Sequence, residues 1–572
     1  MPETEPNEAC LATLRFRLLD LALCFAGGTC FAAALPPFNL HFLALVTLVP
    51  VIAVASRSRW KFAALCGYAW GIGWSFFAFR FLREIDPVIP FLMPWVISLW
   101  PACWAALLPF LRRNTLFPLE IELEGHEERR EYETSPRSFP RQCLFALGAA
   151  ALYTLVEWTR SRLFPWNDLS VTMWRDIPLI QFASITGNYG IMFLLAFFNA
   201  ALAAALLVRF RLPGIKLLLL AAALFTLVHA AGLLLYYHLA RSGEPNWFPA
   251  LLQGDISQRR NATIDEADEA LDVYAELARQ AAGAEVKPDI VIWPESSVPV
   301  PFRAAHPVSA KFRRIVRSLC VSYGVPMLVG AIDFRDPLPR DGSLARVTNS
   351  ALHFDRSGKL VHKYDKIHRV PFGEYVPFRS VLPEFAVKRI DMMRDLEPGT
   401  NYEPVPLGGN VRAGIAICFE GIFSYLTRTF ALRGANVLVV ISNDAWYPAS
   451  SEPEQHLANA VMRAVETGLP MVRCGNNGGS LVVLPTGELG QVLEVSGPEK
   501  RPELRRGRGV RQVGVFVPDR PEPTLYVRFG EWFVLLLGIF CAGWTLYAAR
   551  NFARRKQYYR LRIFNPGNKE TP

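Results

Sequence analysis

One apolar run of this chain ends in a cysteine, in the stretch AGIAICFEGIF (413–423). Cys418 follows a strand-like segment, and Glu420 and a glycine come directly after it. A strand-to-turn position exposes a side chain, as at the nucleophiles of unrelated hydrolases. A cysteine that only fills a core needs no such turn, so the local pattern leaves a reactive and a structural role open.

Two more reactive side chains stand at or just past the ends of predicted strands. Glu295 follows DIVIWP, and Lys366 follows a predicted hairpin that turns at Ser357 and Gly358. Catalytic groups of layered α/β proteins gather beyond the carboxyl ends of strands. Each residue alone has a plainer interpretation, as a solvated acid, a surface lysine or an inert thiol. Their combination is what indicates a site.

Glu295, Lys366 and Cys418 together carry the groups that acyl transfer needs. A cysteine attacks as the thiolate, and because its free pKa is about 8.5 it requires a nearby base or cation. A carboxylate can act as the general base, and a lysine can stabilise the oxyanion that forms when sulfur adds to a carbonyl. No close His, Cys and Asp spacing of the metal-ligand type occurs outside the apolar runs. We therefore expect neither a metal nor another cofactor.

The elements that must position these residues follow from short runs between residues 248 and 468. Apolar runs typical of strands alternate with amphipathic helical patterns. Strands are predicted near 248–256, 289–295, 326–334, 350–366 (a hairpin), 413–418 and 436–447, and helices near 263–281, 312–319 and 456–468. This alternation predicts a layered α/β domain with a mixed sheet.

The rest of the chain has the composition of a membrane protein. Of its 572 residues, 51% are hydrophobic and only 20% charged, and the apolar residues cluster in 18–239 and again near the end. Eight candidate spans are Leu18–Leu35, Phe42–Ala55, Phe62–Phe79, Phe91–Leu111, Leu144–Trp158, Ile191–Val208, Leu217–Leu239 and Trp532–Ala549. The second and fifth are short for a bilayer, and three prolines in the fourth predict kinks.

These runs divide the chain into four parts. Residues 1–240 hold seven spans with a charged cytoplasmic insert at 112–141, residues 241–528 form the catalytic domain, 529–549 the eighth span, and 550–572 a basic tail. Clusters of Lys and Arg before the first span, after the second and sixth, and in the tail fall on one side if there are eight spans. Both termini are then cytoplasmic and residues 241–528 face outside.

The formal charge of +10 does not indicate nucleic-acid binding, because the basic residues gather at span ends rather than in one stripe with aromatics. The outward-facing domain holds three of the ten cysteines: Cys320, Cys418 and Cys474. An odd number leaves at least one thiol outside a disulfide within the domain. Cys320 lies on the apolar face of a predicted helix and Cys474 follows a strand-like run, so both are expected in the core.

The motifs around the three reactive residues resemble a known family. WPES, YDKIHRVPFGEYVPF and ICFEGIF occur in the order of the Glu–Lys–Cys triad of the nitrilase superfamily. With SNDAWYPASSEPEQHLANAVMRAVETGLP, they are similar to its membrane-embedded branch, the apolipoprotein N-acyltransferases. The resemblance implies an αββα nitrilase-like sandwich attached to an all-α transmembrane bundle of about eight helices.

The resemblance also implies roles for individual residues. Glu295 would be the base, Lys366 the oxyanion stabiliser and Cys418 the nucleophile. Substrate binding and support of the site are expected from four further residues: Glu374, Phe419, Glu420 and Trp446. The run QGDISQRRNAT lacks the tryptophan that the family usually carries there, and RCGNNGGS departs from its Thr-Asn-Asn-Gly run.

The implied reaction has two steps that share a Cys418 thioester. An acyl chain leaves a phospholipid, expected to be phosphatidylethanolamine, and passes to the α-amino group of the N-terminal diacylglyceryl-cysteine of an apolipoprotein. The expected place is the bacterial inner membrane, with the catalytic domain on the periplasmic side. Two alternatives are a membrane-anchored amidase that hydrolyses a small amide with the same triad, and a transporter or scaffold with an inactive domain.

Overall fold

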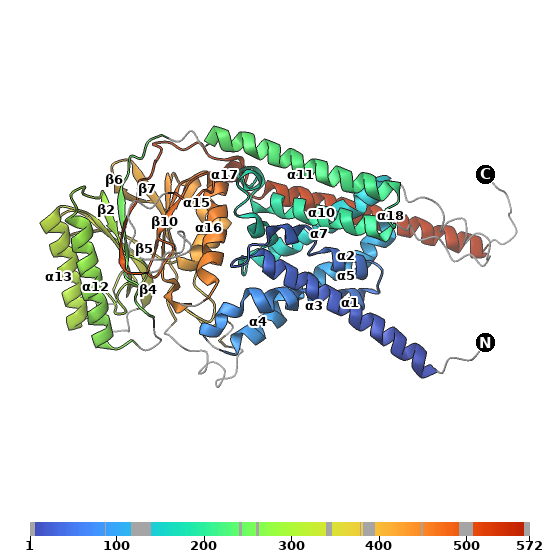
Figure 1. Cartoon of the computed structure of the whole chain (residues 1–572), viewed down its shortest axis with the longest axis horizontal. Coiled ribbons are helices and arrows are strands. Elements are labelled where there is room, and N and C mark those ends of the chain that lie inside the picture. Colours follow the sequence, from blue (N-terminus) through green and yellow to red (C-terminus); the bar gives the residue numbers. More distant parts are fainter. Residues whose placement is uncertain are drawn as a thin grey trace.

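The structure, a computed structural model, describes the residues 6–85, 87–115, 139–239, 243–258, 262–338, 346–377, 379–380, 395–447, 450–490 and 507–564, with backbone only for 6–14 and 551–564. Residues 116–138 of the predicted cytoplasmic insert and 565–572 of the predicted tail lie outside these ranges. Figure 1 shows a layered α/β domain beside a bundle of long helices.

Within the described ranges, six stretches are helical, long and apolar enough to cross a membrane. They lie in α1 (Pro6–Ala34), α4 with α5 (Ile89–Ile97, Leu99–Thr115), α7 (Phe139–Ser161), α10 (Asn188–Leu207), α11 (Leu212–Leu239) and α18 (Trp532–Phe564). The break between α4 and α5 falls in the span for which prolines predicted kinks. Each stretch overlaps one predicted span, and the chain is a membrane protein.

The other two predicted spans take different forms. The third corresponds to α3 (Trp60–Ala78), which packs against α1 so closely that a Cβ on Gly28 would lie 1.9 Å from the Trp70 carbonyl oxygen. Small residues allow such close helix packing in membranes. The second corresponds to a 3₁₀ turn, η1 (His41–Leu45), and the short helix α2 (Val49–Ala55), which are too short to span a bilayer on their own.

The first sheet of the α/β domain has six strands. Its order is β11 (Gly509–Gln512), β1 (Pro249–Gln253), β2 (Ile290–Ile292), β3 (Met327–Phe334), β4 (Val347–Phe354) and β5 (Leu360–Asp365). β1, β2 and β3 run parallel, and the outer pairs are antiparallel. Two amphipathic helices, α12 (Ile264–Ala282) and α13 (Pro307–Tyr323), bury their apolar faces against this sheet.

The second sheet has five strands. Its order is β10 (Leu481–Val483), β9 (Met471–Gly475), β8 (Val437–Ser442), β7 (Val411–Ile417) and β6 (Val405–Gly408), with β7, β8 and β9 parallel. The helices α15 (Ser424–Leu432) and α16 (Glu452–Thr467) cover it. The sequence predicted one mixed sheet; the structure has two, because alternation along the chain does not show which strands share a sheet. The αββα expectation is confirmed.

The layers follow one another along the long axis of the molecule in Figure 1: α12 and α13, two sheets, α15 and α16, and then the helix bundle. Short elements connect the two halves: η2 (Arg80–Glu84), η3 (Leu169–Met173), α8 (Ile177–Ile180), α9 (Ala183–Thr186) and α17 (Leu525–Phe529). In the aromatic stretch 163–174, Trp166 and Trp174 are buried at this junction rather than exposed as an interfacial belt.

Candidate active site

Glu295 lies just past the end of β2, where the chain turns away from the first sheet. Gly330 on β3 permits this course, because a Cβ there would lie 2.1 Å from the Pro294 carbonyl oxygen and 2.8 Å from the Glu295 Cα. Ser297 fastens the turn by donating both its N–H and its hydroxyl to the Gly330 carbonyl. The carboxylate is thereby aimed from the sheet end into the domain, and only 6% of the residue is exposed.

Three donors surround the Glu295 carboxylate. Oε1 accepts the side-chain amide of Asn349 on β4 at 2.7 Å and the Lys366 ammonium at 3.2 Å, and Oε2 accepts the Asn443 backbone N–H at 3.0 Å. Because Asn443 follows β8, Glu295 joins the two sheets at the site. A carboxylate held this way has a fixed orientation for proton transfer.

Lys366 follows β5 directly and is buried between two acids. Its Nζ lies 3.2 Å from Glu295 Oε1 and 2.9 Å from Glu374 Oε1. Burial alone would lower the pKa of Lys366, but the charges of Glu295 and Glu374, and to a smaller degree Cys418, raise it well above its usual range. The side chain therefore stays a cation at any working pH.

Glu374 forms an ion pair with Lys366. It lies in the turn after Val370, whose backbone N–H donates to Glu374 Oε2 at 2.8 Å, while Glu374 Oε1 faces both Lys366 and the Asn349 amide at 3.1 Å. The Asn349 amide thus bridges Glu295 and Glu374. The structure places Glu374 against Lys366, in a position to orient the ammonium.

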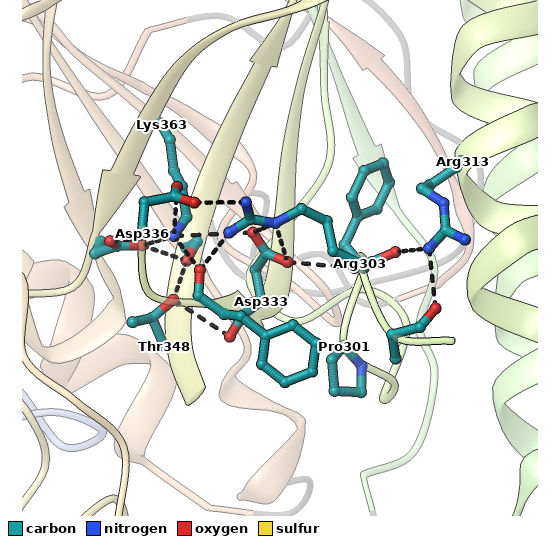
Figure 2. A network of polar contacts seen from close by, with 12 residues as sticks. Pro301, Arg303, Arg313, Asp333, Asp336, Thr348 and Lys363 are labelled. Carbon is teal, nitrogen blue, oxygen red and sulfur yellow. Dashed lines mark hydrogen bonds and ion pairs between the residues drawn. The ribbon is translucent and has the colours of Figure 1, made fainter. Parts of the chain in front are cut away.

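A second group of charged side chains lies on β3 and β5 and in the segments that follow Glu295 and β3 (Figure 2). Arg303, in the segment that follows Glu295, donates to Asp333 at the end of β3, to Asp336 at 2.6 Å and to a backbone carbonyl. Asp333 is fully buried. This ion-pair network ties the Glu295 segment to β3.

The same network continues to β5. Lys363 donates to the Phe334 carbonyl at 2.6 Å and lies 2.9 Å from Asp365, the residue directly before Lys366. The segment that follows Glu295 and the strand that precedes Lys366 therefore both contact one cluster of charged side chains.

Cys418 directly follows β7 and begins a 3₁₀ turn, η4 (Cys418–Ile422). Its φ of +54° lies in the left-handed region, where a side chain costs about 1–2 kcal/mol. The residue is partly exposed. Burial of the thiol and the charge of Glu295 raise the pKa of Cys418 well above its usual value, and the charge of Lys366 opposes this only in part. Resting Cys418 is a thiol, placed where an acid and an ammonium act on it.

Glu420 joins the cysteine turn to the lysine segment. Its Oε2 accepts the Ile417 N–H at 2.8 Å and the Tyr364 hydroxyl at 3.0 Å, and its Oε1 accepts the N–H groups of Ile367 and His368. Burial raises the pKa of Glu420 to about 7, although these hydrogen bonds oppose the shift. Fully enclosed, Glu420 holds the backbone on both sides of the site.

A buried polar cluster lies beneath the nucleophile. Cys418 Sγ, a carboxylate oxygen of Asp444 and a ring nitrogen of His456 lie within 4.8 Å of one another. His456 contacts the Cys418 carbonyl through Nε2, and its Nδ1 faces Asp444 and Arg473, whose guanidinium also contacts Asp444 at 2.8 Å. A metal cation bound to Cys418, Asp444 and His456 would lie beside the positively charged guanidinium of Arg473, which would repel it. The chemistry of these donors therefore fits a hydrogen-bonded cluster better than a metal centre.

Two further residues predicted from the sequence are Phe419, which follows the nucleophile in the chain, and Trp446. Phe419 is 5% exposed, and its ring stacks on Phe164 and Trp166 of the helix bundle, with centroids 5.9 and 6.1 Å apart. Trp446 lies in the 3₁₀ turn η5 (Asp444–Trp446) after β8 and is partly buried. No contact of Trp446 links it to Glu295, Lys366 or Cys418 among the described residues.

Several residues at the site were not singled out from the sequence. Asn349 stands within β4, His456 within α16, and Asn443 and Asp444 just after β8. The latter two lie inside the run 436–447 that the sequence predicted as a strand, and the strand itself ends at Ser442. Nothing in the local sequence marks Asn349 or His456, because their partners lie in other segments of the chain.

Two family models match the chain. The model described as "Carbon-nitrogen hydrolase" covers residues 250–493, and the one described as "Apolipoprotein N-acyltransferase N-terminal domain" covers residues 27–201. The first covers most of the α/β domain, without β11, and contains all three reactive residues. The second covers most of the helices that precede it.

Curated relatives match over both halves. The apolipoprotein N-acyltransferase of Geobacter metallireducens is 29% identical over 553 residues, which cover 94% of this chain and 96% of that protein. That of Sinorhizobium medicae is 32% identical over 370 residues, 62% of this chain and 67% of that protein. Among solved structures, an amidase from Nesterenkonia sp. aligns with 51% of this chain and 96% of its own, at a TM-score of 0.33 and 19% identity.

Proposed function

Since the chain belongs to the apolipoprotein N-acyltransferase family, we propose that Cys418 takes an acyl chain from a phospholipid and passes it to the N-terminal diacylglyceryl-cysteine of an apolipoprotein. The observation that carries the proposal is the contact of Glu295 with Lys366 beside Cys418. Transfer through the enzyme in two half-reactions splits one difficult step into two easier ones.

In the first half-reaction, Glu295 takes the thiol proton as sulfur attacks the ester carbonyl. Because the raised pKa of Cys418 disfavours a free thiolate, proton transfer and attack proceed together. The carbon–sulfur bond forms, the ester C–O bond breaks, and protonated Glu295 returns its proton to the departing lysophospholipid oxygen. The product is a Cys418 thioester with Glu295 again ionised.

Lys366 stabilises the oxyanion in both half-reactions. The raised pKa of Lys366 keeps the ammonium charged, and its carboxylate neighbours fix its position, so it supplies a preorganised positive charge where negative charge develops. In the second half-reaction the α-amino group attacks the thioester, Glu295 accepts its proton, and the thiol re-forms as the C–S bond breaks. The stable amide makes the overall transfer favourable.

Both proposed substrates carry acyl chains, which accounts for the attached helix bundle. Moving an acyl chain out of the bilayer costs about 0.8 kcal/mol per CH₂ group, so the site must lie at the membrane surface. We propose phosphatidylethanolamine as the donor. We further propose the bacterial inner membrane as the location, with residues 241–528 on the periplasmic side and both termini cytoplasmic. The start of α1 and the end of α18 lie at the same far end of the bundle, which supports this orientation (Figure 1).

Incubation of the purified full chain with phospholipid carrying a labelled acyl chain tests the proposal. We expect a hydroxylamine-sensitive label on Cys418 that disappears when a diacylglyceryl peptide with a free amino group is added, with labelled amide as product. A Cys418→Ser variant is the control. If water instead releases the acyl group of a small amide, and no lipid label reaches Cys418, the amidase alternative replaces the proposal.

A further inference from the structure

Helix α16 lies between the catalytic sheets and the helix bundle (Figure 1), and several of its buried residues are polar. Every residue from Glu452 to Thr467 except Pro453 is buried. Buried polar side chains must be hydrogen-bonded to avoid a large cost. Two adjacent residues of this helix form their hydrogen bonds with different halves of the molecule. Gln455 bonds to the helix bundle, and His456 bonds to the catalytic domain.

Gln455 is bonded to the membrane half. Its Oε1 accepts the indole N–H of Trp166 at 3.1 Å and the amide of Asn167 at 2.7 Å, and its Nε2 donates to the carbonyls of Pro36 and Ala78, both at 3.1 Å. Pro36 follows α1, Ala78 ends α3, and the other two follow α7. One side chain therefore joins three separate parts of the bundle.

His456 is hydrogen-bonded to the backbone of the nucleophile, Cys418. Its Nε2 lies 3.1 Å from the Cys418 carbonyl oxygen, and its Nδ1 lies 3.1 Å from the Arg473 guanidinium. Burial and the charge of Arg473 lower the pKa of His456, and Asp444 opposes this. The contact with the Cys418 carbonyl requires a proton on Nε2, while Nδ1 faces both the Arg473 guanidinium at 3.1 Å and an Asp444 carboxylate oxygen at 3.2 Å.

The contact falls where the backbone needs support. Cys418 adopts a left-handed conformation that side chains rarely hold. Glu420 accepts the N–H of Ile417 on one side of the cysteine, and His456 donates to the carbonyl on the other. The direction of the sulfur depends on this turn, and a displacement of about 1 Å in a reacting group can cost about 10²-fold in rate.

We propose that His456 is a positioning residue that holds the Cys418 turn, and that α16 transmits the position of the membrane helices to the nucleophile through the adjacent Gln455. The inference rests on the proposed function only in that Cys418 is the acylated residue. The membrane half would then act on the chemistry as well as on lipid access.

Two substitutions at His456 separate its two contacts. In His456→Gln the terminal amide nitrogen can occupy the position of Nε2 and donate to the Cys418 carbonyl. In His456→Asn the shorter side chain reaches the Nδ1 position only, so it keeps the contact with Arg473 and loses the one with Cys418. Because Asn also leaves a larger cavity than Gln, thermal midpoints separate lost packing from the lost contact with Cys418.

The measurements use the full chain in lipid nanodiscs. They are the rate of Cys418 alkylation by iodoacetamide, followed on the Cys418 peptide by mass spectrometry, and the single-turnover rate of thioester formation. We expect His456→Asn to slow both by about tenfold or more, and His456→Gln to stay within about threefold of wild type. Thermal midpoints report folding separately.

Equal effects of the two variants, or a tenfold loss in a folded His456→Gln, would overturn the role of His456. Gln455→Ala tests the membrane link, since it should slow alkylation of Cys418 although it changes no residue that contacts the thiol. Unchanged alkylation in a folded Gln455→Ala would refute that link. If wild type forms no thioester, the proposed function fails, and the alkylation rates still decide the positioning role.

Discussion

The two sheets of the catalytic domain deliver their reactive groups by different means. The six-stranded sheet supplies Glu295 and Lys366, which are held by each other, by Glu374 and by an asparagine amide. The five-stranded sheet supplies Cys418, which is held by the conformation of its backbone. Charged groups are positioned here by side-chain partners, and the sulfur is positioned by the main chain.

The chemistry of the groups explains this difference. A thiol is a weak hydrogen-bond donor and acceptor, so side-chain partners cannot orient it well. A carboxylate and an ammonium form strong, directional hydrogen bonds. Replacement of Glu295 or Lys366 should therefore alter charge and protonation, whereas the placement of the Cys418 sulfur should depend on backbone geometry. The following predictions test that division.

The largest loss is expected from removal of the sulfur. Cys418→Ser should reduce acyl transfer by about 10³-fold or more, because a hydroxyl is a much poorer nucleophile near neutral pH. The turn conformation should persist, so thermal stability should change little. Single-turnover assays with labelled phospholipid and a melting curve measure both. Substantial residual transfer would show that another residue carries the acyl group.

Glu295→Gln should affect proton transfer on the first sheet. We expect acylation to fall by about 10²–10⁴-fold, the usual contribution of a general base. Since the charge of Glu295 raises the pKa of Cys418, its removal should lower that pKa and make alkylation faster at neutral pH. Opposite changes in the two rates would confirm the assignment. A parallel fall in both rates would contradict it and indicate a disturbed fold.

Gly330→Ala should disturb the turn that carries Glu295. A Cβ 2.1 Å from the Pro294 carbonyl forces the backbone to move, at about 1–3 kcal/mol of folding free energy. Acyl transfer should fall even in the folded fraction. Gly538→Ala is the matched control, because an added Cβ there meets no atom within 4 Å. Equal melting temperatures for both variants would count against the close approach.

The smallest effect is expected from the pH dependence of stability at Glu420. Its pKa is raised from 4.5 to about 7 in the folded protein. The folded state therefore binds more protons than the unfolded state in this window, and this group makes stability fall as pH rises from about 4.5 to about 7.

Thermal midpoints measured across that range give the slope for wild type and for Glu420→Gln. The variant should show a flatter dependence than wild type. An unaltered slope in Glu420→Gln would show that its carboxyl does not titrate in this window.

Local pattern predicted much of this domain. The apolar runs predicted most strands, and Glu295, Lys366 and Cys418 were found because each stands at the end of one. The partition into two sheets, strand β11 and the roles of Asn349 and His456 were not predicted. Each depends on which segments meet in space: Asn349 bridges two acids from other segments, and His456 reaches a carbonyl from a neighbouring layer.

The helix bundle shows the same limit. Apolar composition located all eight candidate segments, but length and packing decided their form. His41–Ala55 became two short pieces, and the chain after α7 forms short helices and a buried tryptophan segment that hydropathy did not mark as structured. The hydrogen bonds of Gln455 to this junction could not be inferred from the sequence, because the partners of Gln455 are backbone carbonyls and side chains far away in the chain.

The contacts of Gln455 also set an order of assembly. Pro36, Ala78 and Trp166 precede α16 by several hundred residues, so ribosomes make the segments that receive Gln455 well before the helix that carries it. Under the proposed link through Gln455, newly made protein aligns its sulfur only once those earlier segments have packed against α16. Biogenesis itself would then keep the thiol idle until the enzyme has reached the lipids on which it acts.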